Sequence, residues 1–184
     1  MTTIALGPDT GSLLLRTGRS GLGRRAGHDL TIEATRWSGT VTLAGDGPGG
    51  HRAEGSSAEV TVPVDGLEIR EGTGGVLPLS DQDRTEIAAN LRKILQADRY
   101  PEITFTGTRA EGAPSDFSVE GRLTIMGRTE PLTVRGGGVN GRIRGAATVK
   151  QSRWGIKPYS AFFGALKLAD EVEVVFDLAI DLGP

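Results

Sequence analysis

Residues able to carry out chemistry are few in this 184-residue chain, which has no cysteine and only two histidines, His28 and His51. Without cysteine the chain has no thiolate nucleophile and no cysteine-based zinc or iron–sulfur site. Two histidines are too few for an all-histidine metal site. No nucleophile elbow, zinc-protease or Walker A motif occurs either. The sequence therefore predicts no catalytic residue, no metal site and no cofactor.

Two glycine-rich segments are candidates for phosphate binding. Gly45–Gly50 fits the pattern G-x-G-x-x-G, but a strand is expected after it, whereas dinucleotide phosphates bind at a helix N-terminus. Gly18–Gly27 carries three arginines and could bind an anion through backbone N–H and guanidinium groups. We interpret both as loops between strands and leave anion binding by the second open.

His28 and Asp29 are adjacent in the sequence and have the residue types of an acid–base pair. Neighbours on a strand point to opposite faces of the sheet, so they do not predict a dyad. A hydrogen-bonded structural role is the simpler interpretation of His28, with a ligand-facing or general-base role as the alternative.

Large aromatic side chains are the remaining candidates for a binding role. Those on predicted strands belong to the core or line an internal cavity, whereas Trp154, Phe162 and Phe163, beside a predicted loop, are expected at a pocket mouth. With only nine aromatic residues the interior is mostly aliphatic, which favours an apolar chain as ligand over a stacked base. The candidates are Trp37, Phe105, Phe117, Trp154, Phe162, Phe163 and Phe176.

Alternation of apolar and polar residues predicts the strands that would position these side chains. Residues 117–125 and 172–180 show it clearly, and similar segments give about eight strands separated by Gly, Pro, Asn and Asp. Their regular spacing favours an antiparallel barrel or sandwich. Small inward residues such as Gly121 and Gly145 would leave room inside.

One segment, at about 80–97, has helical periodicity. Ser80 is a suitable N-cap, and the apolar residues fall on one helical face, which predicts an amphipathic lid over one barrel end. The face consists of Ile87, Leu91, Ile94 and Leu95. Gly45–Ser57 and Lys157–Asp170 lack clear periodicity and are expected to be loops.

The formal net charge is −2, which argues against nucleic-acid binding. No apolar stretch approaches the roughly 20 residues needed to span a membrane. The N-terminus has no basic segment followed by an apolar one, so no signal peptide is predicted and a cytoplasmic location is expected. The length predicts a single domain over 1–184. A homodimer stays open, because no motif specifies one.

Four sequence blocks occur in an order known from one family. Residues 92–106 join a helix end to Tyr-Pro-x-Ile-x-Phe, and residues 121–131 read Gly-x-Leu-Thr-Ile-x-Gly-x-Thr-x-Pro. Residues 153–156 (Arg-Trp-Gly-Ile) and 170–174 (Asp-Glu-Val-Glu-Val) are the third and fourth. Over roughly 12–182 the chain thereby resembles the YceI-like family of lipocalin-like polyisoprenoid-binding proteins.

The resemblance implies an all-β fold, an extended eight-stranded antiparallel lipocalin-like β-barrel covered by one helix. It implies that the barrel binds a long apolar isoprenoid or lipid-like molecule for carriage or sequestration. His28, Tyr100 and Arg153 match family positions and are further candidate ligand-binding residues. An enzyme of cyclase or isomerase type using His28 and Arg153 in the same cavity, and a ligand-free interaction module with a filled interior, are the alternatives.

Overall fold

The computed structural model describes residues 1–20, 28–45, 50–74, 78–158, 160–161 and 166–180. In these ranges one long helix, α1 (Asp81–Ile94), accompanies a single antiparallel sheet, with short 3₁₀ turns at Val64–Gly66 and Gln151–Trp154. The strands are β1 (Thr2–Leu6), β2 (Gly11–Ser20), β3 (His28–Ala34), β4 (Ser38–Ala44), β5 (Arg52–Pro63), β6 (Leu67–Gly74), β7 (Glu102–Ala113), β8 (Asp116–Ile125), β9 (Arg128–Val139), β10 (Arg142–Lys150), β11 (Ser160–Ala161) and β12 (Leu166–Leu178).

The sheet curls into a barrel because several strands are bent rather than interrupted. Its hydrogen-bonded order is β1-β4-β5-β7-β8-β9-β10-β12-β2-β3-β6, with β11 beside β12. Only three residues separate β3 from β4, and one 3₁₀ turn separates β5 from β6. β3 pairs with β6, and β4 pairs with β5. β3–β4 and β5–β6 are therefore two long bent strands that pair with each other, and they connect the two ends of the hydrogen-bonded order.

The same bending explains why the described residues form twelve strands, although about eight are predicted. β1 pairs with β4 and β2 pairs with β3, so β1 and β2 together follow the bent strand formed by β3 and β4. If β1–β2, β3–β4 and β5–β6 each count as one bent strand, eight strands surround the interior and β11 is an addition. The predicted all-β, barrel-like fold with one helix is confirmed, and the plain strand count is corrected.

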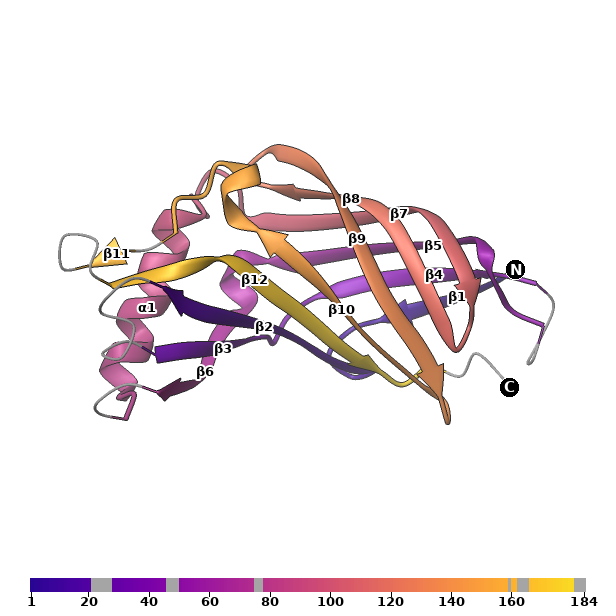
Figure 1. Cartoon of the computed structure of the whole chain (residues 1–184), viewed down its shortest axis with the longest axis horizontal. Coiled ribbons are helices and arrows are strands. Elements are labelled where there is room, and N and C mark those ends of the chain that lie inside the picture. Colours follow the sequence, from indigo (N-terminus) through magenta and orange to yellow (C-terminus); the bar gives the residue numbers. More distant parts are fainter. Residues whose placement is uncertain (21–27, 46–49, 75–77, 159, 162–165, 181–184) are drawn as a thin grey trace.

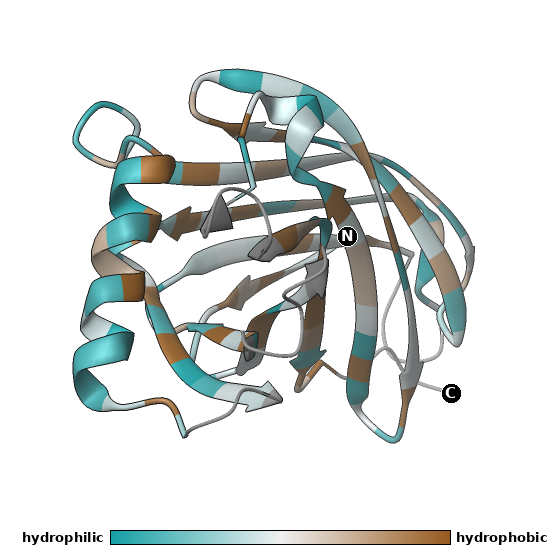
Figure 2. Cartoon of the chain, turned by 60° about the vertical axis from the view of Figure 1, so that its left-hand side comes forward, coloured by the Kyte–Doolittle hydropathy of each residue, from teal (hydrophilic) through white to brown (hydrophobic). Residues whose placement is uncertain are grey.

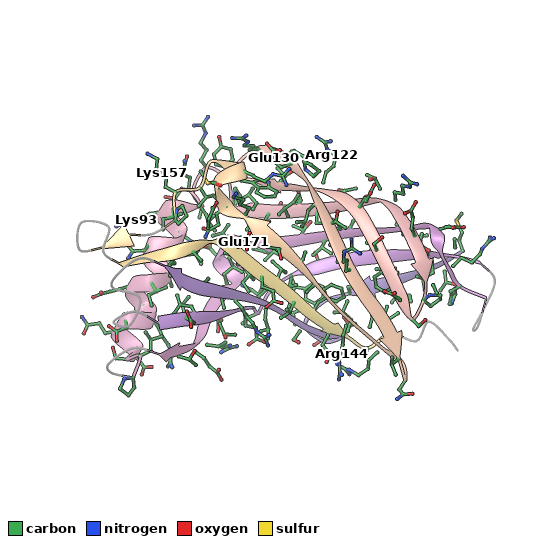
Figure 3. The ribbon with its side chains drawn as sticks, viewed as in Figure 1. Lys93, Arg122, Glu130, Arg144, Lys157 and Glu171 are labelled. Atoms are coloured by element: carbon green, nitrogen blue, oxygen red, sulfur yellow. The ribbon has the colours of Figure 1, made fainter. Side chains whose placement is uncertain are left out.

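Apolar and polar residues alternate along the strands because each strand directs every second side chain into the barrel. Hydrophilic and hydrophobic bands alternate along the strands in Figure 2. The inward side chains make one continuous apolar core, and Trp154 is its largest fully buried member. Charged side chains gather on the outside (Figure 3), as in the ion pairs of Asp177 with Arg142 and Arg144.

Helix α1 lies across one end of the barrel, beside the ends of β2, β3 and β6 (Figure 1). Ser80 caps it: its hydroxyl accepts a hydrogen bond from the backbone N–H of Asp83, whose carboxylate accepts one from the N–H of Ser80. The apolar face packs against the core, and the C-cap residue Leu95 is buried. The predicted amphipathic helix over the barrel end is confirmed. We call this the helix end and the opposite one the hairpin end.

Both predicted loops contain strand, which corrects the expectation. Within Gly45–Ser57, β5 begins at Arg52, and within Lys157–Asp170, β11 and the start of β12 are strand. Apolar periodicity misses the start of β5 because a register break opposite β4 and the positive φ of Gly55, +81°, mark a β-bulge that shifts the pattern.

Candidate functional site

An apolar cavity of about 280 Å³ lies inside the barrel. Residues from most of the strands line it, with Leu6 from β1, Val60 from β5 and Val174 from β12 among them. Four of the aromatic residues singled out in the sequence also line it: Trp37, Phe105, Phe117 and Phe176. The sequence thus brings its central aromatic residues together around one space.

The three phenyl rings are seated on glycines of neighbouring strands. Phe117 of β8 pairs with Gly136 of β9, which pairs with Gly145 of β10, and Gly145 pairs with Phe176 of β12. Directly opposed residues in an antiparallel sheet share a face, so these four form an inward row across four strands.

A methyl group on any of these glycines would collide with a ring. A Cβ on Gly136 would lie 2.9 Å from Cζ of Phe117, a Cβ on Gly145 would clash with Phe176, and one on Gly121 would clash with Phe105. The predicted role of the inward glycines is therefore corrected. They leave room that phenyl rings fill, and the three rings line the cavity that remains.

The helix end of the barrel is filled by side chains that do not line the cavity. The 3₁₀ turn before Gly155 places Trp154 inward, where it is 2% exposed, and its Nε1 donates a hydrogen bond of 2.9 Å to the carbonyl of Leu123. Leu95 and Ile156 are buried in the same core. Trp154, expected at a pocket mouth, instead packs the closed end of the barrel.

Two other residues carried over from the resemblance also lie outside the described cavity lining. Tyr100 packs over Gly127, and the Arg99 guanidinium lies 5.1 Å from the centre of its ring. Arg153 lies 5.7 Å from the Trp154 ring centre and 3.9 Å from a carboxylate oxygen of Glu130. Arg153 therefore does not line this cavity.

Three candidate side chains fall where the structure gives no description. The backbone of His28 pairs with Gly74 at the helix end, but its side chain lies outside the described set, as do Phe162 and Phe163. Their roles stay predictions, and so does ligand binding by the four aromatic residues that line the cavity.

Polar lining residues of the cavity come mainly from one segment that the sequence analysis treated as a loop. They are His51, directly before β5, and Arg52, Ser56 and Ser57 at the start of β5. Ser56 is occupied locally, since its hydroxyl accepts from the N–H of Ala44 and donates to the carbonyl of Arg52. The available signal was a histidine–arginine pair directly after a glycine-rich turn, which apolar periodicity does not register.

Two carboxyl groups with lowered pKa values lie away from the cavity. Hydrogen bonding from Ser152 lowers the pKa of Asp170, and hydrogen bonding from Arg142, then Arg144, lowers that of Asp177. Both stabilise the barrel exterior. In the described ranges no three acidic or histidine side chains gather as metal ligands.

Comparisons with known proteins place the chain by family and by fold. The pattern that defines the YceI-like domain matches residues 17–180. BcnA of Burkholderia cenocepacia has a similar structure, with a TM-score of 0.62 and 20% identity over 90% of this chain and 94% of that one. A YceI protein of Campylobacter jejuni has a TM-score of 0.55 and 18% identity over 80% and 81%.

A search of curated protein sequences finds no match to the chain. Among its described helices, none has both the length and the apolar character needed to cross a membrane.

Proposed function

The chain belongs to the YceI-like family, and from that premise we propose that it binds an apolar isoprenoid or lipid-like molecule inside its barrel and carries or sequesters it. The family is known for a polyisoprenoid-binding fold. The observation that carries the proposal is the apolar cavity of about 280 Å³ enclosed by the curled sheet.

The size of the cavity suits a short chain. Engineered apolar cavities of about 150 Å³ bind benzene, which has six carbons. By the same ratio a cavity of about 280 Å³ accepts roughly eleven carbons without rearrangement. A longer isoprenoid fits only if the rings of Phe105, Phe117 or Phe176 move or if part of it leaves the barrel.

Burial of an apolar chain supplies the affinity. Each buried CH₂ contributes about 0.8 kcal/mol, which is about fourfold in the dissociation constant. The lining leaves few polar groups to desolvate, so most of this gain is kept. The cavity of about 280 Å³ lies at the lower edge of the roughly 300–1,000 Å³ that is usual for ligand pockets, so a ligand-free interaction module stays the alternative function.

A cavity-filling pair of variants tests the proposal. Ala147 of β10 lines the cavity, while its neighbour Ala146 does not, because adjacent strand residues face opposite sides of the sheet. Ala147→Phe places a ring in the cavity, and Ala146→Phe adds the same ring outside as a matched control.

Geraniol and farnesol, with ten and fifteen carbons, are the probes, and calorimetry and thermal unfolding are the measurements. We expect wild type and Ala146→Phe to bind and to be stabilised by the probe. We expect Ala147→Phe to bind at least tenfold more weakly. Absence of binding to wild type, or equal binding to both variants, would contradict the proposal.

A further inference from the structure

The wall of the barrel is split between β5 and β7 at the hairpin end. Pairing of these two strands ends at Ala58 and Gly107. Beyond this point, within the described residues, β5 pairs only with β4 and β7 pairs only with β8. In Figure 1 the hairpin of β7 and β8 leaves the direction of β5 at the right-hand end. Residues 52–57 of β5 and 108–113 of β7 thus border a lateral opening in the sheet.

Two β-bulges lie beside this opening. β5 has a register break opposite β4, and within it Gly55 has a φ of +81°. β7 has a register break opposite β8 between Gly107 and Arg109. A bulge bends its strand and interrupts regular pairing, and bulges are common at the rims of barrels. The separation of the two strands is therefore built into the register of both.

The lining of the cavity changes where the pairing ends. Along the paired part of β5 every second residue lines the cavity, as expected for a closed wall. These residues are Ala58, Val60 and Val62. Along the unpaired part, consecutive residues line it, and they are Arg52 with Ala53 and Ser56 with Ser57. Across the opening, Ala110 of β7 and Pro114 after it also line the cavity.

Ser57 shows most directly that the cavity reaches the edge of β5. Its neighbour Ala58 pairs with Val41 of β4, and both line the cavity from the inner face. Ser57 pairs with Thr42, which does not line the cavity, so Ser57 belongs to the outer face. Ser57 is exposed and nevertheless lines the cavity. The cavity therefore meets it from the side, past the unpaired edge of the strand.

The helix end, in contrast, is closed and fastened. It is filled by the buried side chains of Trp154, Leu95 and Ile156, which do not line the cavity. Arg92, in the last turn of α1, forms ion pairs with Asp98 and with Asp65 in the turn between β5 and β6. No residue of α1 lines the cavity.

We propose that an apolar molecule enters and leaves the barrel sideways, through the lateral opening between β5 and β7, while α1 remains in place as a plug. The inference rests on the proposed function and adds the route by which the ligand is exchanged. The route needs no movement of Trp154 or of the helix, because the opening already connects the cavity with the surface at Ser57.

An obstacle attached at the opening after folding tests the route. The chain has no cysteine, so Ser57→Cys supplies a single thiol at the opening. Glu59→Cys supplies a matched thiol on the same strand, at an exposed position that does not line the cavity. Each folded variant is coupled to glutathione through a disulfide, which dithiothreitol removes. The probe is 1-aminonaphthalene, whose fluorescence depends on the polarity of its surroundings and whose ten carbons are within the roughly eleven that the cavity accepts.

We expect glutathione on Ser57→Cys to slow association and dissociation of the probe by about tenfold each and to leave the dissociation constant within about twofold. Both rates change together because an obstacle in a passage raises the barrier equally in the two directions. Dithiothreitol should restore both rates, and glutathione on Glu59→Cys should change neither. Unchanged rates on Ser57→Cys, or weaker affinity with an unchanged association rate, would overturn the proposed route.

Loosening the helix is the complementary test. Arg92→Gln removes the ion pairs with Asp65 and Asp98, and we expect both rates to stay at the wild-type values. Faster exchange in this variant would place the route at the helix end and overturn the inference. If wild type binds the probe and neither label affects the rates, this inference fails alone; if wild type binds no probe, the proposed function fails with it.

Discussion

Replacing Phe176 by alanine tests whether the phenyl rings limit the length of the chain that the cavity accepts. The ring lines the cavity and covers Gly145 on the neighbouring strand. Removing it adds roughly the volume that benzene occupies in an engineered cavity, about 150 Å³. The cavity of about 280 Å³ would then grow to about 430 Å³.

The longest chain that gains from burial should grow by about the six carbons of the lost ring. In wild type we expect affinity for alkyl chains to rise about fourfold per CH₂ up to roughly eleven carbons and then to level off. In Phe176→Ala the break, which is the chain length at which affinity levels off, should move to about seventeen carbons.

Stability should fall at the same time. A fully buried phenylalanine costs about 3–5 kcal/mol when truncated. Phe176 is half-buried and already faces a cavity, so we expect a loss of about 2 kcal/mol.

The assay is a titration series with alkanols of eight to twenty carbons, together with denaturant unfolding of the free protein. Tyr100→Ala, an aromatic truncation outside the cavity lining, is the control and should keep the wild-type break. An unchanged break in Phe176→Ala would refute the idea that this ring limits chain length.

Three further changes test the barrel itself. Ser80→Ala removes the cap of α1 and should cost about 1 kcal/mol in denaturant unfolding; no loss would mean that the capping box does not stabilise the helix. Trp154→Phe leaves the carbonyl of Leu123 without its donor and should lower the free energy of unfolding by about 2 kcal/mol. Affinity for 1-dodecanol should not change, and a changed affinity would place Trp154 in the binding site. The folded-state pKa of Asp177 is lowered by its hydrogen bonds from Arg142, then Arg144. Its contribution to stability is therefore complete above the unfolded pKa of about 3.9 and is lost as pH falls through the lower folded pKa; Asp177→Asn should flatten this part of the pH–stability curve, and an unaltered curve would contradict the assignment.

Local signals made much of the fold predictable from the sequence. Alternation over residues 117–125 predicts β8, and the capped apolar face after Ser80 predicts α1, because each element carries its own pattern. Apolar periodicity does not predict β1 or the start of β5, which are strands because they pair with β4.

The cavity was less predictable because it depends on register between distant strands. Sequence parity places Phe117 and Phe176 on inward faces, but only the pairing through Gly136 and Gly145 shows that the rings sit on glycines. Trp154 has the residue type of a cavity-mouth aromatic, yet the 3₁₀ turn that carries it directs it into the closed end. His51, directly before β5, lines the cavity, and apolar periodicity does not reveal this.

Native mass spectrometry of the protein purified without detergent from its source organism tests the central claim, that the barrel carries an apolar molecule, most directly. We predict a mass added to the chain that is released by organic extraction, and none on Ala147→Phe purified in the same way, because its new ring occupies the cavity. The bare chain mass alone in wild type, or the same added mass on Ala147→Phe, would contradict the account.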